Sequence, residues 1–342
     1  MELKIGLTYN LKSDCPSKIQ SNEDASAEFE SAETVEDIVL ALTSLGHTVI
    51  SLPYNPALPK ILSEVNVDIV FNIAEGWWGR NREALVPALL EFYEIPYTGS
   101  DPLTLGLCLD KALCKKIAED AGIAAAWGIT ADGFNSIKAD ELKYPVFVKP
   151  NAEGSSKGIR SWSLVRDRNE LEISLEWVLR NYGQCALIEE FLPGREFTIA
   201  VIGNKTPTTL PIMEILPGEK CAKTNGFIYS FETKSSNLEQ LLCPAPIDEY
   251  LQNRLLDMAL RVFQALNCRD VARIDFRLDR SGNPRFLEVN PLPGLSRVSL
   301  LTLQAQAAGM TFDDLLAAIL SAALERYPEL SMGNHAKEAA LG

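Results

Sequence analysis

The spacing of apolar residues predicts alternating strands and helices over the first hundred residues. Short apolar runs at 4–9, 48–52 and 68–73 are typical of buried strands, whereas residues 32–45 and 82–92 repeat apolar positions at helical spacing. Strands that alternate with helices in this way favour a parallel sheet. No G-x-G-x-x-G follows the first strand, so the fingerprint of dinucleotide-binding proteins is absent.

The rest of the chain is expected to mix helices with further strands. Ser100, Asp101 and Pro102 form a helix start, and that helix is predicted to run to about Ala121. Strands are predicted at 144–149, 186–190 and 196–202, helices at 169–181, 252–266 and 311–326, and a hairpin at 271–278 and 284–290. Residues 227–243 are polar and poorly periodic, which predicts a long loop that covers or binds a ligand.

The predicted hairpin carries the most informative polar residues. Side chains alternate along a strand, so Arg273 and Asp275 share one face, as do Glu288 and Asn290 on the partner strand. A turn centred at 281–282 places Asp275 opposite Glu288, and opposed carboxylates repel each other unless a cation lies between them. Because Asp, Glu and Asn oxygens suit magnesium, the hairpin predicts a metal site. The alternative is an exposed hairpin whose charges the neighbouring arginines neutralise.

A glycine- and serine-rich loop at 153–158 follows the predicted strand that ends in Lys149. Glycine lets backbone N–H groups approach phosphate oxygens closely, and Ser155 and Ser156 add donors. A lysine at the edge of the loop supplies a compact charge for a phosphate. Alone, such a loop is most often only a turn, but its place upstream of the acidic hairpin favours phosphate binding. It is not a Walker A motif, because G-x-x-x-x-G-K-[ST] does not occur.

The composition limits the kind of protein this is. The 342 residues are enough for two or three domains, and 46% hydrophobic with 23% charged residues is typical of globular proteins. The net charge of −14 disfavours nucleic-acid binding. No apolar run approaches the roughly 18 residues that span a membrane. The start has no signal-peptide pattern. We therefore expect a cytoplasmic protein that binds neither nucleic acid nor a membrane.

The cysteines and histidines exclude further chemistry. Seven scattered cysteines without a C-x-x-C pair indicate reduced thiols and no structural zinc site. The two histidines are His47, at a helix-to-strand corner, and His335, in a polar tail. Catalysis by histidine is therefore not expected.

Taken in order, these segments resemble the D-alanine–D-alanine ligase family of ATP-grasp enzymes. The segments are Lys111 in CLDKALCK, Lys149 with its loop, EEFLPGRE at 189–196, residues 273–275, and Glu288 and Asn290 with PLPGLS. The resemblance covers roughly residues 68–325 and, more loosely, the N-terminal sheet. It implies an α/β ATP-grasp fold in which two α+β subdomains clasp ATP. The implied division is a Rossmann-like domain at 1–98, a central subdomain at 99–185, a C-terminal subdomain at 186–330 and a polar tail at 331–342.

The resemblance also implies roles for individual residues. Contacts to ATP are implied for Lys111, Lys149, Ser156, Glu189, Glu190, Phe191, Leu192, Glu196 and Lys234. Two Mg²⁺ ions, or Mn²⁺, are implied at Asp275, Glu288 and Asn290. Catalytic contacts are implied for Arg273, the backbone of Gly294 and Ser155, and amino-acid contacts for Glu75, Glu232 and Ser299. The implied reaction joins two amino acids through an acyl phosphate, in a protein that is commonly a homodimer.

The chain departs from the family at the amino-acid site. Where the family has a glutamate just after the first strand to hold an ammonium group, the sequence offers Glu28 or Glu30 at a longer spacing. Ser235 stands where a tyrosine usually follows the loop lysine. The family's His-Gly…Glu-Asp-Gly loop becomes AEGWWGRNREA, with Trp77 and Trp78 either core or interface residues. Three alternatives stay open: D-alanyl-D-alanine formation, joining or cyclising other amino acids, and nucleotide binding without turnover.

Overall fold

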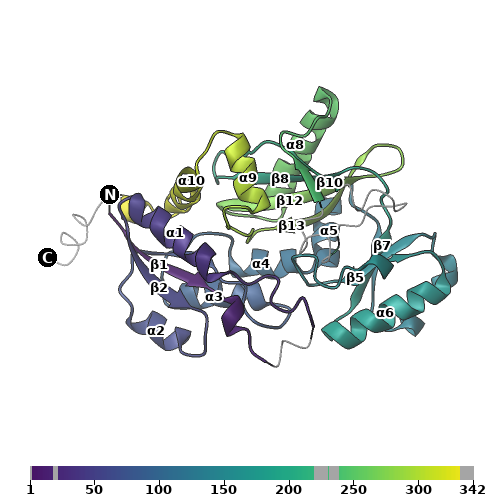
Figure 1. The fold of residues 1–342 in the computed structure, drawn as a ribbon, viewed down its shortest axis with the longest axis horizontal. Helices are drawn as coiled ribbons and strands as arrows, with labels where there is room; N and C mark the ends of the chain where they lie inside the picture. Colours follow the sequence, from purple (N-terminus) through teal and green to yellow (C-terminus); the bar gives the residue numbers. More distant parts are fainter. Residues whose placement is uncertain (1, 18–21, 219–229, 231–238, 332–342) are drawn as a thin grey trace.

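The computed structural model describes residues 2–17, 22–218, 230 and 239–331, and in this part the chain forms three sheets flanked by helices (Figure 1). The first sheet is parallel, in the order β2-β1-β3, as the strand–helix alternation predicts. Its strands are β1 (Lys4–Tyr9), β2 (Thr48–Pro53) and β3 (Ile69–Ile73), and its helices α1 (Ala32–Ser44), α2 (Leu58–Glu64) and α3 (Leu85–Phe92). All five residues of β3 are buried, as expected for a strand covered on both faces.

The second sheet is antiparallel, in the order β4-β7-β5-β6. Its strands are β4 (Gly128–Ala131), β5 (Val146–Pro150), β6 (Leu164–Val165) and β7 (Ala186–Glu190). Helix α6 (Arg168–Tyr182) covers it with Leu171, Leu175 and Val178, which lie on one face at helical spacing. Strand β7 begins just after the expected boundary at 185 and belongs to this middle sheet.

The third sheet contains the predicted hairpin and has the order β11-β10-β8-β12-β13, with β9 beside β8. Its strands are β8 (Glu196–Ile202), β9 (Thr208–Thr209), β10 (Met213–Pro217), β11 (Glu239–Leu242), β12 (Val271–Leu278) and β13 (Pro284–Asn290). Helix α8 (Glu249–Ala265) packs on it and begins at the cap Asp248, a few residues earlier than predicted. The prediction of a loop throughout 227–243 is wrong at its end, because β11 pairs with β10 there.

The prediction of one helix from 102 to 121 is also wrong. The chain forms α4 (Pro102–Leu109) and α5 (Lys111–Asp120), separated by Asp110 in an extended conformation. The Asp110 carboxylate accepts hydrogen bonds from the Leu113 amide (3.1 Å) and from Asn151 Nδ2 (2.8 Å). This break places Lys111 at the first turn of a new helix, beside the glycine- and serine-rich loop.

The end of the described chain packs back onto the first sheet. Helix α10 (Phe312–Leu324), with its predicted cap Thr311, buries Leu315 and Leu316 in the same core as Ile38 and Phe71. Helices α9 (Leu300–Ala307) and α11 (Pro328–Ser331) were not predicted. Short 3-10 helices lie at Lys12–Asp14, Arg82–Ala84, Phe134–Ser136, Ala139–Glu141 and Ser161–Ser163. Among the described residues no single helix is long and apolar enough to cross a membrane, and the one pair that reaches that length together, α9 and α10, is bent by 102°.

Candidate functional site

The hairpin has the predicted pairing at its acidic end. Asp275 lies opposite Glu288, and Arg273 opposite Asn290, across β12 and β13. A regular hairpin with its turn centred at 281–282 does not explain this pairing. Between Phe276 and the turn, the pairing of the two strands is shifted by one residue. The pairing at Asp275 therefore depends on an irregularity inside the hairpin.

That irregularity is a β-bulge at Leu287. Phe276 pairs with Phe286, whereas its neighbour Asp275 pairs with Glu288. Leu287 is therefore an extra residue with no partner opposite it on β12. Phe286 packs against Phe276 in the core, with ring centroids 6.1 Å apart, whereas Leu287 and Glu288 both line the cavity beside the sheet. The bulge thus turns Glu288 towards the cavity.

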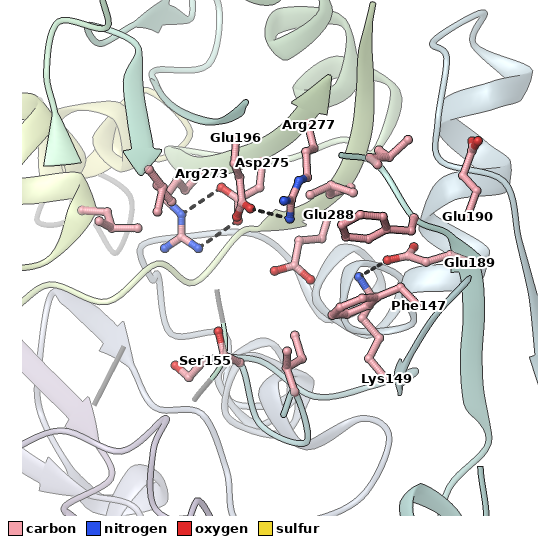
Figure 2. A pocket seen from close by; sticks show the side chains of 17 residues that line it. Phe147, Lys149, Ser155, Glu189, Glu190, Glu196, Arg273, Asp275, Arg277 and Glu288 are labelled. Atoms are coloured by element: carbon pink, nitrogen blue, oxygen red, sulfur yellow. Dashed lines mark hydrogen bonds and ion pairs between the residues drawn. The ribbon is translucent and has the colours of Figure 1, made fainter. Parts of the chain in front are cut away.

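Each opposed carboxylate has a cationic partner of its own. Asp275 accepts hydrogen bonds from Arg273 Nε (3.2 Å) and Nη2 (3.1 Å) (Figure 2). It also accepts one from Thr198 Oγ1 (2.6 Å). Glu288 forms an ion pair with Lys111 Nζ at 3.2 Å. The two carboxylates therefore have cationic partners without a metal, Asp275 through a neighbouring arginine as the alternative expected, and the metal site stays a prediction.

The ionisation of Glu288 follows from these neighbours. Burial acts to raise the pKa of its carboxyl group, but the positive charges of Lys111, Lys149 and Arg273 outweigh burial and lower the pKa to about 2. Glu288 is therefore a carboxylate at all physiological pH values.

The donor set nevertheless suits a hard cation. Asp275 and Glu288 offer carboxylate oxygens, and Asn290 offers an amide oxygen while its Nδ2 donates to Asp275 (3.2 Å). Among the described residues no three His, Cys, Asp or Glu side chains gather closely enough to enclose a metal. A magnesium ion here would thus need phosphate or water oxygens to complete its shell, as is usual for Mg²⁺ at nucleotide sites.

A buried glutamate holds two lysines at the opposite wall of the cavity. Glu189 on β7 is 3% exposed and pairs with Lys149 Nζ at 2.7 Å (Figure 2). It also pairs with Lys115 Nζ. Burial acts to raise the pKa of Glu189, but Lys115 and Lys149 outweigh it and the pKa falls. Lys115 was not predicted from the sequence, although it lies one helical turn after Lys111 on the same face of α5.

The loop between these walls has an unusual backbone. Ser155 and Ser156 have φ of 49° and 58°, in the left-handed region, and the Lys157 amide donates to the Gly154 carbonyl at 2.9 Å. Two successive positive φ values at the centre of such a turn are typical of type I′ geometry. Residues other than glycine adopt this region at a cost, of order 1–3 kcal/mol each, and do so mostly at ligand-binding loops. Both serines line the cavity.

The first domain clamps this loop through Glu28. Its carboxylate accepts hydrogen bonds from the Gly154 amide (2.7 Å), Lys157 Nζ (3.1 Å) and Arg82 Nη2 (2.6 Å). Burial opposes ionisation, but Arg82 and Lys157 hold the pKa of Glu28 well below its usual range. A Cβ atom on Gly154 would lie 2.7 Å from Glu28 Oε1, so glycine is required for this approach. Glu28 therefore lines a second cavity with its carboxylate already hydrogen-bonded, and Glu30 lines the same cavity, so an ammonium-binding role for either stays a prediction.

Asp24 adds a second clamp from the same segment. It is 0% exposed and accepts hydrogen bonds from the Gly158 amide (3.0 Å), Arg160 Nη2 (2.9 Å) and the Tyr182 hydroxyl (2.7 Å). The loop is thus fixed at both ends by carboxylates of the N-terminal segment.

The remainder of this cavity is apolar, with one ion pair. Its apolar lining includes Phe147, Ile159, Phe191, Leu192, Ile215 and Leu287. Glu196 pairs with Arg277 Nη1 at 3.2 Å, and the Arg277 guanidinium lies 5.5 Å from the centre of the Phe191 ring. Burial raises the pKa of Glu196 in spite of Arg277. The Glu190 carboxylate accepts a hydrogen bond from the Trp127 amide (2.9 Å) and does not pair with Arg277.

A second cavity adjoins the first, and the two share Ser155, Arg273 and Glu288 as lining residues. Lys111, Gly294, Ser299 and Glu75 also line the second cavity. The Ser299 hydroxyl caps α9 by accepting from the Thr302 amide at 3.4 Å. Predicted residues Glu232 and Lys234 lie outside the described residues.

The two adjacent tryptophans line neither of these cavities. Trp77 packs edge-on against Tyr54, with ring centroids 5.0 Å apart, and Trp78 is 60% exposed. Both border a separate hollow beside Asp110 and Gln184. Their bulk therefore does not shape the space next to Arg273.

Comparisons with known proteins agree with this arrangement. Residues 124–321 match the family model for the D-ala D-ala ligase C-terminus. The chain is 36% identical over 300 residues to the D-alanine–D-alanine ligase of Syntrophotalea carbinolica, covering 87% of this chain and 93% of that protein. It is 37% identical over 304 residues to the uncharacterized protein y4sG of Sinorhizobium fredii, covering 85% of this chain and 88% of that protein.

Solved structures show the same fold. The crystal structure of D-alanine–D-alanine ligase from Bacillus anthracis complexed with ATP superposes with a TM-score of 0.74 at 25% identity, covering 96% of this chain and 99% of that one. VanG D-Ala:D-Ser ligase from Enterococcus faecalis superposes with a TM-score of 0.73 at 22% identity, covering 94% of this chain and 100% of that one.

Proposed function

This chain belongs to the D-alanine–D-alanine ligase family, and from that premise we propose that it uses ATP to join the carboxylate of one amino acid to the amine of another. The observation that carries the proposal is the meeting of Lys111, Lys149 and Arg273 around two connected cavities, beside the loop of Ser155 and Ser156. Lys111 begins α5, Lys149 lies on β5 of the second sheet and Arg273 on β12 of the third, so distant segments of the chain converge on this point.

The proposed reaction has two steps. A carboxylate oxygen of the first amino acid attacks the γ-phosphorus of ATP, whose bond to the bridging oxygen breaks to release ADP. The amine nitrogen of the second amino acid then attacks the acyl carbon and loses a proton, and phosphate leaves with the oxygen it gained. Phosphoryl transfer depends on positioning and charge neutralisation more than on covalent help. The lining fits this demand, because lysines and arginine line the two cavities and no histidine does among the described residues.

The roles of the individual residues follow from where they lie. Lys149 and Lys111 would face phosphate oxygens, with Ser156 as a further donor. The apolar wall beside Phe191 would take the adenine, and Glu196 the ribose hydroxyls. Arg273 lines both cavities, so it would stabilise negative charge on the acyl oxygen together with the Gly294 backbone N–H.

We also propose that Asp275, Glu288 and Asn290 hold magnesium, or manganese in its place, as two ions. Their carboxylate and amide oxygens are hard ligands that leave positions for phosphate and water. When bound, the ions would neutralise charge on the transferred phosphoryl group. The protein's part is to keep Glu288 ionised and aimed at the cavity, which the bulge and Lys111 accomplish.

Phosphate release tests the proposal directly. The purified protein is incubated with ATP, magnesium and single or paired D- and L-amino acids, and products are weighed by mass spectrometry. We expect phosphate release only with certain amino acids, and a product mass equal to the sum of its parts minus water. Binding of ATP without consumption across the panel would instead support a nucleotide-binding module.

A second candidate keeps the chemistry and changes the substrates. Glu28 lines the second cavity, but its carboxylate already accepts hydrogen bonds from Gly154, Lys157 and Arg82, unlike a glutamate kept for the ammonium of a D-alanine. This observation favours other amino acids, joined to each other or closed into a ring. The panel above separates the two candidates by product mass. A cytoplasmic homodimer remains the expectation from the family resemblance, and light scattering tests the dimer.

A further inference from the structure

Two acidic side chains in the second cavity have no hydrogen-bond or ion-pair partner among the described residues. They are Glu75, which is half-buried, and Glu83, which is only 7% exposed, and both line the cavity that also contains Arg273 and Gly294. A buried carboxylate without a partner is costly, because burial disfavours the charged form. Such a pair is expected to have a ligand.

A tight loop at Gly76 fixes the positions of these two residues. Gly76, with φ of +71°, donates its amide to Asn10 Oδ1 at 3.0 Å, and a Cβ atom there would lie 2.4 Å from the Arg82 carbonyl oxygen. Only glycine lets the two ends of the loop approach so closely. The chain thereby folds back on itself and brings Glu75 towards Glu83.

The positive charge that acts most strongly on the pair, Arg82, is already engaged elsewhere. Arg82 is 4% exposed, donates to Glu28 at 2.6 Å and to the Ala152 carbonyl at 2.9 Å, and so serves the clamp on the phosphate loop. Its charge acts on Glu75 and Glu83 only from a distance, without a hydrogen bond. The negative charge of the pair is therefore left largely uncompensated.

The protonation of the pair reflects that imbalance. Burial, Glu83 and Glu28 raise the pKa of Glu75 well above its usual value, and Glu30 adds to this while Arg82 opposes it. Burial raises the pKa of Glu83 to about 7, with Arg82 and Lys111 opposing and Glu28 and Glu153 adding to the shift. A positively charged ligand group would relieve the repulsion.

We propose that Glu75 and Glu83 form a subsite for an alkylammonium group of an amino-acid substrate. Glu28 lines the same cavity, but its carboxylate already accepts hydrogen bonds from Gly154, Lys157 and Arg82. The inference rests on the proposed ligase function and names the chemical class of the substrate's binding group. The ammonium is either the α-amino group or a side-chain amine. An ammonium group donates three hydrogen bonds and suits two converging carboxylates. With Arg273 in the same cavity, the substrate would have its carboxylate near Arg273 and its amine near the pair.

Calorimetric titration tests the subsite without needing turnover. The full-length protein is titrated with amino acids and with their N-acetyl forms, in both chiral series. Ornithine and norvaline, which differ by the terminal amine, distinguish a side-chain amine from an α-amine. We expect free amino acids to bind at least about tenfold more tightly than acetylated ones, since a hydrogen bond to a charged group typically contributes that much.

The variants Glu75→Gln and Glu83→Gln, singly and together, keep the shape of the side chains and remove the charge. The double variant should lose the preference for the free amine. Glu172→Gln, on the exposed face of α6, is the matched control and should keep it. A stronger preference for ornithine over norvaline would assign the subsite to a side-chain amine, and an equal one to the α-amine.

Three results would overturn the inference: equal binding of free and acetylated amino acids, a double variant that retains the preference, or no amino-acid binding by the wild-type protein. A non-hydrolysable ATP analogue is titrated in parallel. If the wild-type protein does not bind the analogue, the result counts against the ATP-dependent function. The amine preference is measured without nucleotide, so it still tests Glu75 and Glu83 in that case.

Discussion

Two glutamates show how differently the first cavity, which is the proposed phosphate side, and the second cavity are built. Glu288, on the wall that the first cavity shares with the second, lies 3.2 Å from Lys111 and has a pKa of about 2. Glu83, in the adjoining cavity, has no partner among the described residues and a pKa of about 7. The same kind of side chain is held as an anion at Glu288 and near its half-protonated point at Glu83.

The difference indicates what each cavity is prepared for. On the phosphate side, the charges are paired before any ligand arrives, as in Lys149 with Glu189 and Arg273 with Asp275. Preorganised charges of this kind need little rearrangement when charge moves in a reaction. On the other side, Glu75 and Glu83 are left uncompensated, which suits a cavity completed by its substrate.

The largest effect is expected on the phosphate side, from Glu288→Gln. Loss of this carboxylate removes a proposed metal ligand and the partner of Lys111, so phosphate release should fall by at least about 10²-fold. Glu172→Gln should leave the rate unchanged. Turnover of Glu288→Gln at the wild-type rate would remove Glu288 from the proposed site.

Lys115→Met tests the paired charges of the first cavity by removing one of the two lysines that pair with Glu189. Glu189 would keep Lys149 alone, so Lys149 should be drawn away from the phosphates and the affinity for an ATP analogue should fall by about tenfold, the worth of roughly 1.4 kcal/mol. Lys116→Met, on the exposed side of the same helix, is the control. Titration of the analogue measures both, and equal affinities would show that the buried lysine plays no part.

Gly154→Ala tests the contact between Glu28 and the glycine- and serine-rich loop. Because the new methyl group would lie 2.7 Å from Glu28 Oε1, the loop or Glu28 must move, and the KM for ATP should rise several-fold. Gly133→Ala is matched to it, since a Cβ atom at Gly133 meets nothing within 4 Å. An unchanged KM in Gly154→Ala would mean that the loop does not need this contact.

The smallest effect concerns stability and pH. Because folding raises the pKa of Glu83 to about 7, its contribution to stability is complete below the unfolded value, near 4.5, and is lost as the pH rises through 7. Glu83→Gln should therefore melt at the wild-type temperature near pH 4.5 and higher than wild type at pH 8, by roughly 5 °C. A variant that is less stable at pH 8 would show that Glu83 has an unseen partner.

The sequence predicted the hairpin and the glycine- and serine-rich loop because both depend on local patterns, whereas phosphate binding by the loop stays a prediction. Asp275 and Glu288 were placed by strand alternation, and the loop by its glycines and serines. The bulge at Leu287 was missed, because a single extra residue leaves no periodic signal in so short a strand. It is nevertheless what turns Glu288 towards the cavity.

The parts that were missed depend on contacts between distant segments. The commitment of Glu28 to Gly154 joins residues that are 126 positions apart, which no local pattern reveals. The break at Asp110 could be suspected from its capping side chain, but the apolar spacing continues through it. Glu83 was passed over because a glutamate at the start of a predicted helix is common and carries no signal of its own.

The central claim is that a substrate carboxylate attacks ATP, and oxygen labelling tests it most directly. The amino acid that supports phosphate release is prepared with ¹⁸O in its carboxylate, and the released phosphate is analysed by mass spectrometry after one round of turnover. The account predicts one ¹⁸O atom in the phosphate, carried over from the carboxylate. Phosphate without the label, released while the product forms, would contradict it.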